Sequence, residues 1–176
     1  GDDALEGNAG ADFLVGGDGQ DTFEYTDVTD GGLPNNDNVD HDVISDMVLG
    51  EDGDILSFDD AAFFGGGSTL NLQIITGSAD GTDDTDLVDG GVGAAVVVVQ
   101  TTALDDFDAV AALMTAIGGV ATDSDAILIA EVTGQGVFVF YDTDTNAANG
   151  ERVLANLDAL TGADLADIVD ANIDLP

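Results

Sequence analysis

Apolar residues at the start of the chain recur at a fixed distance. Leu5, Leu14 and Phe23 stand nine positions apart, each among glycine, aspartate and other polar residues. Glycine and aspartate recur in the same register, at Gly1, Gly10 and Gly19 and at Asp3, Asp12 and Asp21. A period of nine fits neither the 3.6-residue repeat of a helix nor the two-residue repeat of a strand. It predicts a stack of short strands joined by turns over residues 1–30.

Further along, apolar residues alternate with polar ones or form runs of strand length. Residues 42–58 are typical of two strand-like pieces, with residues 50–54 as the turn between them. Alternation over residues 69–75 indicates a half-buried strand, and the valine-rich run at 94–102 indicates a strand buried on both faces. We expect three more strands, at residues 125–132, 136–142 and 152–157, the first two joined by a short turn.

Two segments change to a helical period. Apolar residues at positions 104, 107, 110, 113 and 117 share one helical face, and Gly118 and Gly119 end that segment. Residues 162–173 have the same character, with Thr161 as the expected cap and with inward-facing Leu165, Ile168, Val169 and Ile173. The predicted fold is mainly β. A short parallel β-roll of repeats (1–30) leads into a β-rich C-terminal body (31–176) with one mid-chain helix and one C-terminal helix.

Charge changes this picture more than any other property. The 176 residues include 37 acidic side chains and one cation, Arg152, so the formal net charge is −36. Proteins bind nucleic acids and anionic membrane surfaces through lysine and arginine, so these partners are excluded unless a metal ion intervenes. No apolar run is long enough to span a bilayer, and cysteine is absent. Two compatible explanations remain: a surface adapted to salty water, and cation sites that neutralise charge on folding.

The repeat itself favours cation sites. It follows the pattern Gly-Gly-x-Gly-x-Asp-x-U-x, where U is a large apolar residue, and this is a calcium-binding β-helix repeat. Glycines permit positive φ and turn carbonyl oxygens inward, and the aspartate adds a carboxylate, so each turn offers hard oxygen ligands. Consecutive repeats lie on opposite sides of such a coil. Turns 18 residues apart should therefore stack, pairing Asp3 with Asp21 and Asp12 with Asp30, with Asp18 as an extra ligand.

These repeats and two downstream segments resemble the C-terminal part of RTX (hemolysin-type calcium-binding) proteins, which a type I secretion system exports. Residues 42–58 resemble the segment that follows the repeats in this family, and residues 139–165 resemble its final strand, acidic turn, strand and Leu-Thr-x-x-Asp segment. The resemblance implies a further calcium site near Asp42, Asp46, Asp52 and Asp54.

The resemblance also implies a function. Such proteins leave the cell unfolded through a C-terminal signal and fold outside when they meet calcium. We therefore expect a secreted, extracellular or cell-surface, non-enzymatic calcium-binding module, part of a structural or adhesive protein, with several Ca²⁺ ions as its cofactor. Two alternatives stay open: the tail of a secreted enzyme whose active site lies upstream, and a self-assembling surface-layer or filament subunit.

Other candidate sites are weaker. Asp142, Asp144 and Asn146 have the spacing of a calcium loop, but they equally suit an Asx-stabilised hairpin turn. The single histidine, His41, fits a loop beside the acidic segment, and no nucleophile stands in a catalytic context. The candidate metal-site residues are Gly1, Asp3, Gly10, Asp12, Gly17, Asp18, Gly19, Asp21, Asp27, Asp30, Asp42, Asp46, Asp52, Asp54, Asp142 and Asp144.

Overall fold

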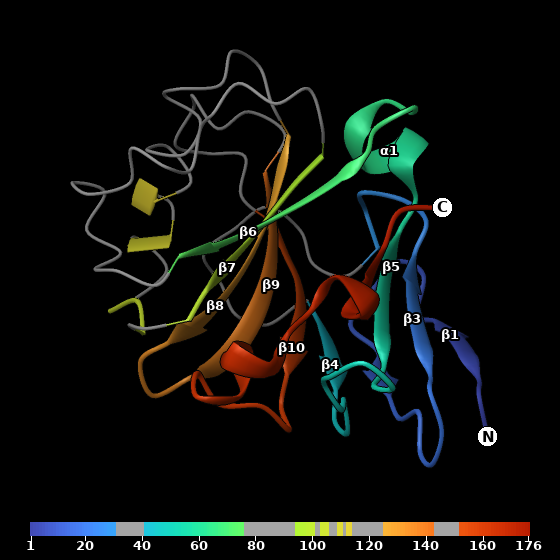
Figure 1. Cartoon of the computed structure of the whole chain (residues 1–176), viewed down its shortest axis with the longest axis horizontal. Coiled ribbons are helices and arrows are strands. Elements are labelled where there is room, and N and C mark those ends of the chain that lie inside the picture. Colours follow the sequence, from blue (N-terminus) through green and yellow to red (C-terminus); the bar gives the residue numbers. More distant parts are fainter. Residues whose placement is uncertain are drawn as a thin grey trace.

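The protein is built mainly from two β-sheets (Figure 1). The computed structural model describes residues 1–30, 41–75, 94–100, 103–105, 109–110, 112–113, 125–142 and 152–176. In these residues a four-stranded sheet has the order β1-β3-β5-β11, and a seven-stranded sheet has the order β2-β4-β10-β9-β8-β7-β6. Neither sheet closes into a barrel, and the described helices are few and short. The prediction of a mainly β protein is confirmed at this level.

The strands and helices are short in the first third of the chain and longer afterwards. Their bounds are β1 (Ala4–Glu6), β2 (Phe13–Leu14), β3 (Thr22–Tyr25), β4 (Asp42–Ile44), β5 (Ile55–Phe58), α1 (Asp60–Phe64), β6 (Leu70–Ile75), β7 (Ala94–Val99), β8 (Ala126–Val132), β9 (Gly136–Asp142), β10 (Arg152–Leu157), the 3-10 turns η1 (Asp164–Asp167) and η2 (Asp170–Asn172), and β11 (Ile173–Asp174).

The first five strands alternate between the two sheets. β1, β3 and β5 lie side by side and parallel in the four-stranded sheet, whereas β2 and β4 pair in parallel in the seven-stranded one. Leu5 lies opposite Phe23, 18 residues further on, and Phe23 lies opposite Leu56. The 18-residue pairing expected from the repeat is therefore present between β1 and β3.

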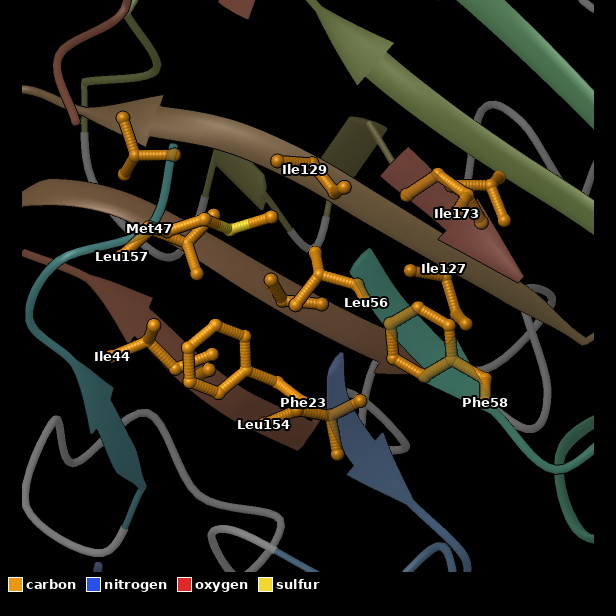
Figure 2. Packing of buried hydrophobic residues seen from close by; sticks show 14 of the residues in the cluster. Phe23, Ile44, Met47, Leu56, Phe58, Ile127, Ile129, Leu154, Leu157 and Ile173 are labelled. Atoms are coloured by element: carbon orange, nitrogen blue, oxygen red, sulfur yellow. The ribbon is translucent and has the colours of Figure 1, made fainter. Parts of the chain in front are cut away.

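The rest of the seven-stranded sheet follows the alternation of apolar residues. β8, β9 and β10 form an antiparallel run at the places that the sequence predicts, and β6 and β7 extend it in parallel beside β8. One apolar core, drawn in Figure 2, collects side chains from both sheets, among them Phe23 and Leu56 on one side and Ile44, Ile127 and Leu154 on the other. A second cluster covers the opposite face of the large sheet, where Leu104, Val110 and Leu113 pack on Phe138 and Phe140.

Two predictions near residue 165 need correction. The prediction of a C-terminal helix is wrong: two separate 3-10 turns replace it, because Ile168 and Val169 adopt extended backbone between them. The predicted cap is reversed, since Thr161 donates its N–H and O–H to the Asp164 carboxylate. Residues 42–58 do contain the two predicted strands, β4 and β5, but the two belong to different sheets.

The mid-chain helix is described in part. Residues 109–110 and 112–113 are helical, and the remainder of residues 102–119, apart from 103–105, lies outside the described part of the chain. The short helix α1 was not predicted. Asp59 caps it by accepting the N–H of Ala62, and Gly65 ends it in the left-handed conformation. No helix among the described residues is long and apolar enough to cross a membrane.

Candidate metal centre

The turns of the first repeats share a backbone geometry with a nine-residue period. Positive φ angles occur at Asn8 (61°) and again at Gly17 (96°), and at Gly10 (129°) and again at Gly19 (136°). Asparagine is among the few non-glycine residues that adopt this conformation readily, so Asn8 fills the glycine position of the earlier repeat. Two successive turns at the start of the chain thus have positive φ angles at equivalent positions.

Aspartates connect successive strands of the four-stranded sheet. The N–H of Asp3 donates to Oδ1 of Asp21 at 2.8 Å, and the N–H of Asp21 donates to Oδ1 of Asp54 at 2.9 Å. Each carboxylate therefore accepts a backbone N–H from the residue just before the preceding strand of the sheet. Asp54 also accepts the N–H of Val48 through Oδ2, so the row ends on a carboxylate with a donor on each oxygen.

A second row runs along the seven-stranded sheet. The N–H of Asp12 donates to Oδ1 of Asp42 at 2.9 Å, and Asp46 accepts the N–H groups of Gly16 and Gly17 at 3.0 and 2.8 Å. We call the two rows together the aspartate ladder; its members are Asp3, Asp12, Asp21, Asp42, Asp46 and Asp54. Asp12 thus meets Asp42 in the place where the repeat predicts Asp30.

Two ladder carboxylates are buried, and each has one oxygen without a partner at hydrogen-bond distance. Asp21 is 0% and Asp42 is 1% exposed, and Oδ2 of each has no hydrogen-bond partner. A buried anionic oxygen without a partner is costly, since it has lost water and gained nothing in exchange. A cation bound at these oxygens would remove that cost.

The space above Gly7 shows where such a cation could sit. A Cβ atom placed on Gly7 would lie 2.9 Å from Oδ2 of Asp42 and 3.3 Å from Oδ2 of Asp12. Two carboxylate oxygens thus converge on one point that only glycine leaves open. Oxygens that converge in this way suit Ca²⁺, which takes oxygen ligands at about 2.3–2.6 Å.

Electrostatics at this point oppose a bare negative charge. Burial raises the pKa of Asp42 to about 6. The nearby carboxylates of Asp12 and Asp30 act in the same direction, whereas the N–H of Asp12 and the neighbouring hydroxyl of Tyr25 lower it. Burial and the Asp42 carboxylate also raise the pKa of Tyr25, a side chain that is 1% exposed. The surroundings of Asp42 therefore favour either a proton or a cation on its carboxylate.

Other predicted site residues have local structural contacts. Oδ2 of Asp30 accepts the N–H groups of Thr26 and Asp27 at 2.8 Å, and Oδ1 of Asp27 accepts from Thr29. Hydrogen bonds from Thr29 lower the pKa of Asp27. Both residues therefore close the turn after β3.

The remaining candidates lie at the periphery. Asp18 is exposed and its carbonyl accepts from the amino group of Gly1, and Asp52 is exposed in the turn before β5. Asp142 ends β9, but its side chain and Asp144 lie outside the described part of the chain. Of the predicted set Asp42, Asp46, Asp52 and Asp54, Asp42 and Asp46 bond to the backbone of the turns around β2, and Asp54 bonds to the backbone of Asp21 before β3. A common calcium site for the four stays a prediction.

Within the described ranges, no group of three or more Asp, Glu, His or Cys side chains is arranged to hold a metal ion. Three residues that contact the ladder or its turns were not predicted. Asp2 accepts the N–H of Gln20, Tyr25 approaches Asp42, and Asn172 contacts the turn that carries Asp54. Only Asp2 had a signal in the sequence, since it precedes a repeat aspartate.

No protein-family model, curated protein or solved structure matches this chain.

Proposed function

We propose that this chain is a calcium-binding module of a secreted or cell-surface protein, in which Ca²⁺ bound at the aspartate ladder completes the fold. The observation that carries the proposal is the pair of buried carboxylates, Asp21 and Asp42, whose Oδ2 atoms have no hydrogen-bond partner. The convergence of Asp12 and Asp42 over Gly7 supports it. Ligands missing from a full Ca²⁺ shell would be backbone carbonyls and water.

The net charge of −36 supports calcium as a folding switch. With little Ca²⁺ present, so many carboxylates repel one another and oppose compaction. Extracellular modules bind Ca²⁺ with Kd on the order of 10⁻⁴ to 10⁻³ M, and a site at ten times its Kd stabilises the folded state by about 1.4 kcal/mol. A few such sites would supply a large share of the stability of a small domain.

The proposal includes the resemblance to RTX proteins. The nine-residue turn geometry and the 18-residue pairing of β1 with β3 are what a short β-roll would require. On this reading the module is non-enzymatic, is exported unfolded by a type I secretion system and folds outside the cell.

A calcium titration of chelator-treated protein tests the proposal. We expect far-ultraviolet circular dichroism to show partial disorder in chelator and a cooperative gain of β structure as Ca²⁺ rises through the submillimolar to millimolar range. Mg²⁺ at equal concentration is the control, since its preference for a smaller octahedral shell should make it less effective. A fully native spectrum in chelator, unchanged by Ca²⁺, would refute the proposal.

One observation favours a second candidate, a self-assembling surface-layer or filament subunit. Among the described residues, β1 and β2 are edge strands, each paired on one side only, and Phe13 in β2 and Val15 after it are 67% and 50% exposed. Edge strands of this kind can pair with another chain. Light scattering with and without Ca²⁺ separates the two candidates, because assembly requires a calcium-dependent increase in mass that a monomeric module lacks.

A further inference from the structure

Asn172, near the end of the chain, is buried and makes four hydrogen bonds. Its Oδ1 accepts the N–H groups of Val169 at 3.1 Å and Gly50 at 3.2 Å, and its Nδ2 donates to the carbonyls of Gly50 at 3.1 Å and Asp54 at 2.8 Å. The side chain is 0% exposed. The Asn172 side-chain amide therefore uses all of its hydrogen-bonding capacity. Three of the four bonds join residues that are about 120 positions apart in the sequence.

These bonds hold the turn on which the four-stranded row of the ladder ends. Gly50 and Asp54 flank the turn before β5, and the N–H of Asp54 donates to the Val48 carbonyl across it. The Asp54 carboxylate holds the backbone of Asp21, whose own Oδ2 has no hydrogen-bond partner. Asn172 thus contacts the support of a proposed cation ligand without contacting the ligand.

The same region anchors the end of the chain. Ile173 pairs with Leu56 in parallel, and Leu165 and Ile168 enter the core cluster that also contains Phe23. Figure 1 shows this terminal segment lying along β5, on the side away from β3 and β1. The terminal segment and the ladder therefore share one structural support, the turn that Asn172 holds.

We propose that Asn172 is a positioning residue that fixes Asp54, and through it Asp21, for cation binding, and that it thereby links Ca²⁺ binding at the ladder to docking of residues 158–176. The inference rests on the proposed function. Because linkage is reciprocal, docking of the terminal segment raises the Ca²⁺ affinity of the ladder by the same factor by which Ca²⁺ favours docking.

Hydrogen exchange of the full chain, followed by mass spectrometry during a Ca²⁺ titration, tests the linkage. In the wild type, peptides covering residues 1–24 and 158–176 should gain protection at one common Ca²⁺ midpoint. Asn172→Ala should raise the midpoint of residues 1–24 roughly threefold to tenfold, because it leaves the Gly50 and Asp54 carbonyls without donors. It should also leave residues 158–176 exchanging fast after residues 1–24 are protected.

The matched control is Val132→Ala, a truncation in the second core cluster, which lies on the other face of the large sheet. It lowers global stability without touching the turn, so its smaller midpoint shift measures the effect of stability alone. Asn172→Asp keeps the acceptor, loses both donor bonds and places a buried carboxylate against the Gly50 and Asp54 carbonyls, so its midpoint shift should be at least as large as that of Asn172→Ala. Equal midpoints in Asn172→Ala and Val132→Ala, with both segments protected together, would overturn the inference.

Failure of the proposed function is distinguishable from failure of the inference. If the wild type is equally protected in Ca²⁺ and in chelator, the calcium function fails. The linkage to Ca²⁺ fails with it, and the positioning role of Asn172 then stands only if Asp54→Ala releases residues 158–176 and Asn172→Ala releases residues 1–24 in chelator. If either variant leaves the distant segment protected, the positioning role fails as well.

Discussion

Two regions of the molecule bury side chains to the same degree, but the buried groups differ: carboxylates in one region and apolar groups in the other. In the ladder region, residues 1–58, the Asp21 and Asp42 carboxylates are at most 1% exposed. In the sheet formed by β8, β9 and β10, side chains such as Ile127, Leu128 and Phe140 are buried to the same degree. Apolar burial is favourable under any ionic condition, whereas buried carboxylates depend on what neutralises them.

The difference teaches that burial alone does not measure stability. The sheet region carries its own driving force, of about 25 cal/mol for each Å² of apolar surface removed from water. Within the ladder region, the repeats at residues 1–24 contribute only three half-buried or buried apolar side chains, Leu5, Leu14 and Phe23. The folding of these repeats should therefore respond to cations, to charge substitutions and to pH, and that of the sheet should not.

The largest effect that we expect is in the sheet. Phe140→Ala removes a ring packed in the second core cluster and should cost about 3–5 kcal/mol of unfolding free energy. The cost should be the same in Ca²⁺ and in chelator, as measured by urea unfolding followed by circular dichroism. Ile74→Ala, at a side chain that is 43% exposed, is the control and should change little. A cost that depends on Ca²⁺ would remove the contrast between the regions.

A steric change in the ladder should have the next largest effect. A Cβ on Gly16 would lie 2.4 Å from Oδ2 of Asp21 and 2.8 Å from its Cβ. Gly16→Ala should therefore displace Asp21 and cost about 1–3 kcal/mol in urea unfolding at saturating Ca²⁺. Gly1→Ala, where a Cβ meets nothing within 4 Å, should be neutral. Equal stability of the two variants would show that Asp21 is not held as described.

Removing the charge of Asp21 should have opposite effects on stability in chelator and in Ca²⁺. Asp21→Asn keeps the acceptor for the Asp3 N–H and removes a buried negative charge. In chelator the variant should be at least as stable as the wild type. In Ca²⁺ at about ten times its Kd it should be about 1.4 kcal/mol less stable, the contribution of one site. Differential scanning calorimetry in the two buffers measures both values, and a change of the same sign in both would contradict a cation role.

The smallest effect concerns pH in chelator. The folded-state pKa of Asp42, about 6, lies above the ordinary 3.8, so the fold favours the protonated carboxyl. Its contribution to stability is complete below about pH 3.8 and is lost as pH rises through 6, on the order of 1 kcal/mol after solvent screening. Asp42→Asn should remove this decline in urea unfolding between pH 4 and 6. Wild type and variant with parallel profiles would count against burial of an unneutralised Asp42.

The sheet could be predicted because its signals are local. β8, β9 and β10 follow runs of apolar and β-branched residues bounded by turns, and the structure places them within one residue of the predicted ends. The 18-residue pairing of β1 with β3 was also predictable, since three repeats share one register. Both are properties of short stretches of sequence.

The ladder partners could not be predicted in full. Asp42 and Asp54 lie 30 and 33 residues beyond Asp12 and Asp21, because the combined glycine, aspartate and apolar register does not continue after Phe23. The prediction of a C-terminal helix was wrong for a similar reason. Its apolar spacing fits a helix, but long-range contacts of Asn172 and β11 hold the same residues in turns and a strand.

The pairing of β11 with β5 has a consequence for the order of events in folding. The four-stranded sheet is completed by β11, where Ile173 pairs with Leu56, 117 residues earlier in the sequence, so the sheet cannot finish forming before these two segments meet. Contacts so distant in sequence close slowly. While the chain is synthesised from its N-terminus, β5 therefore keeps one edge unpaired until β11 has been made.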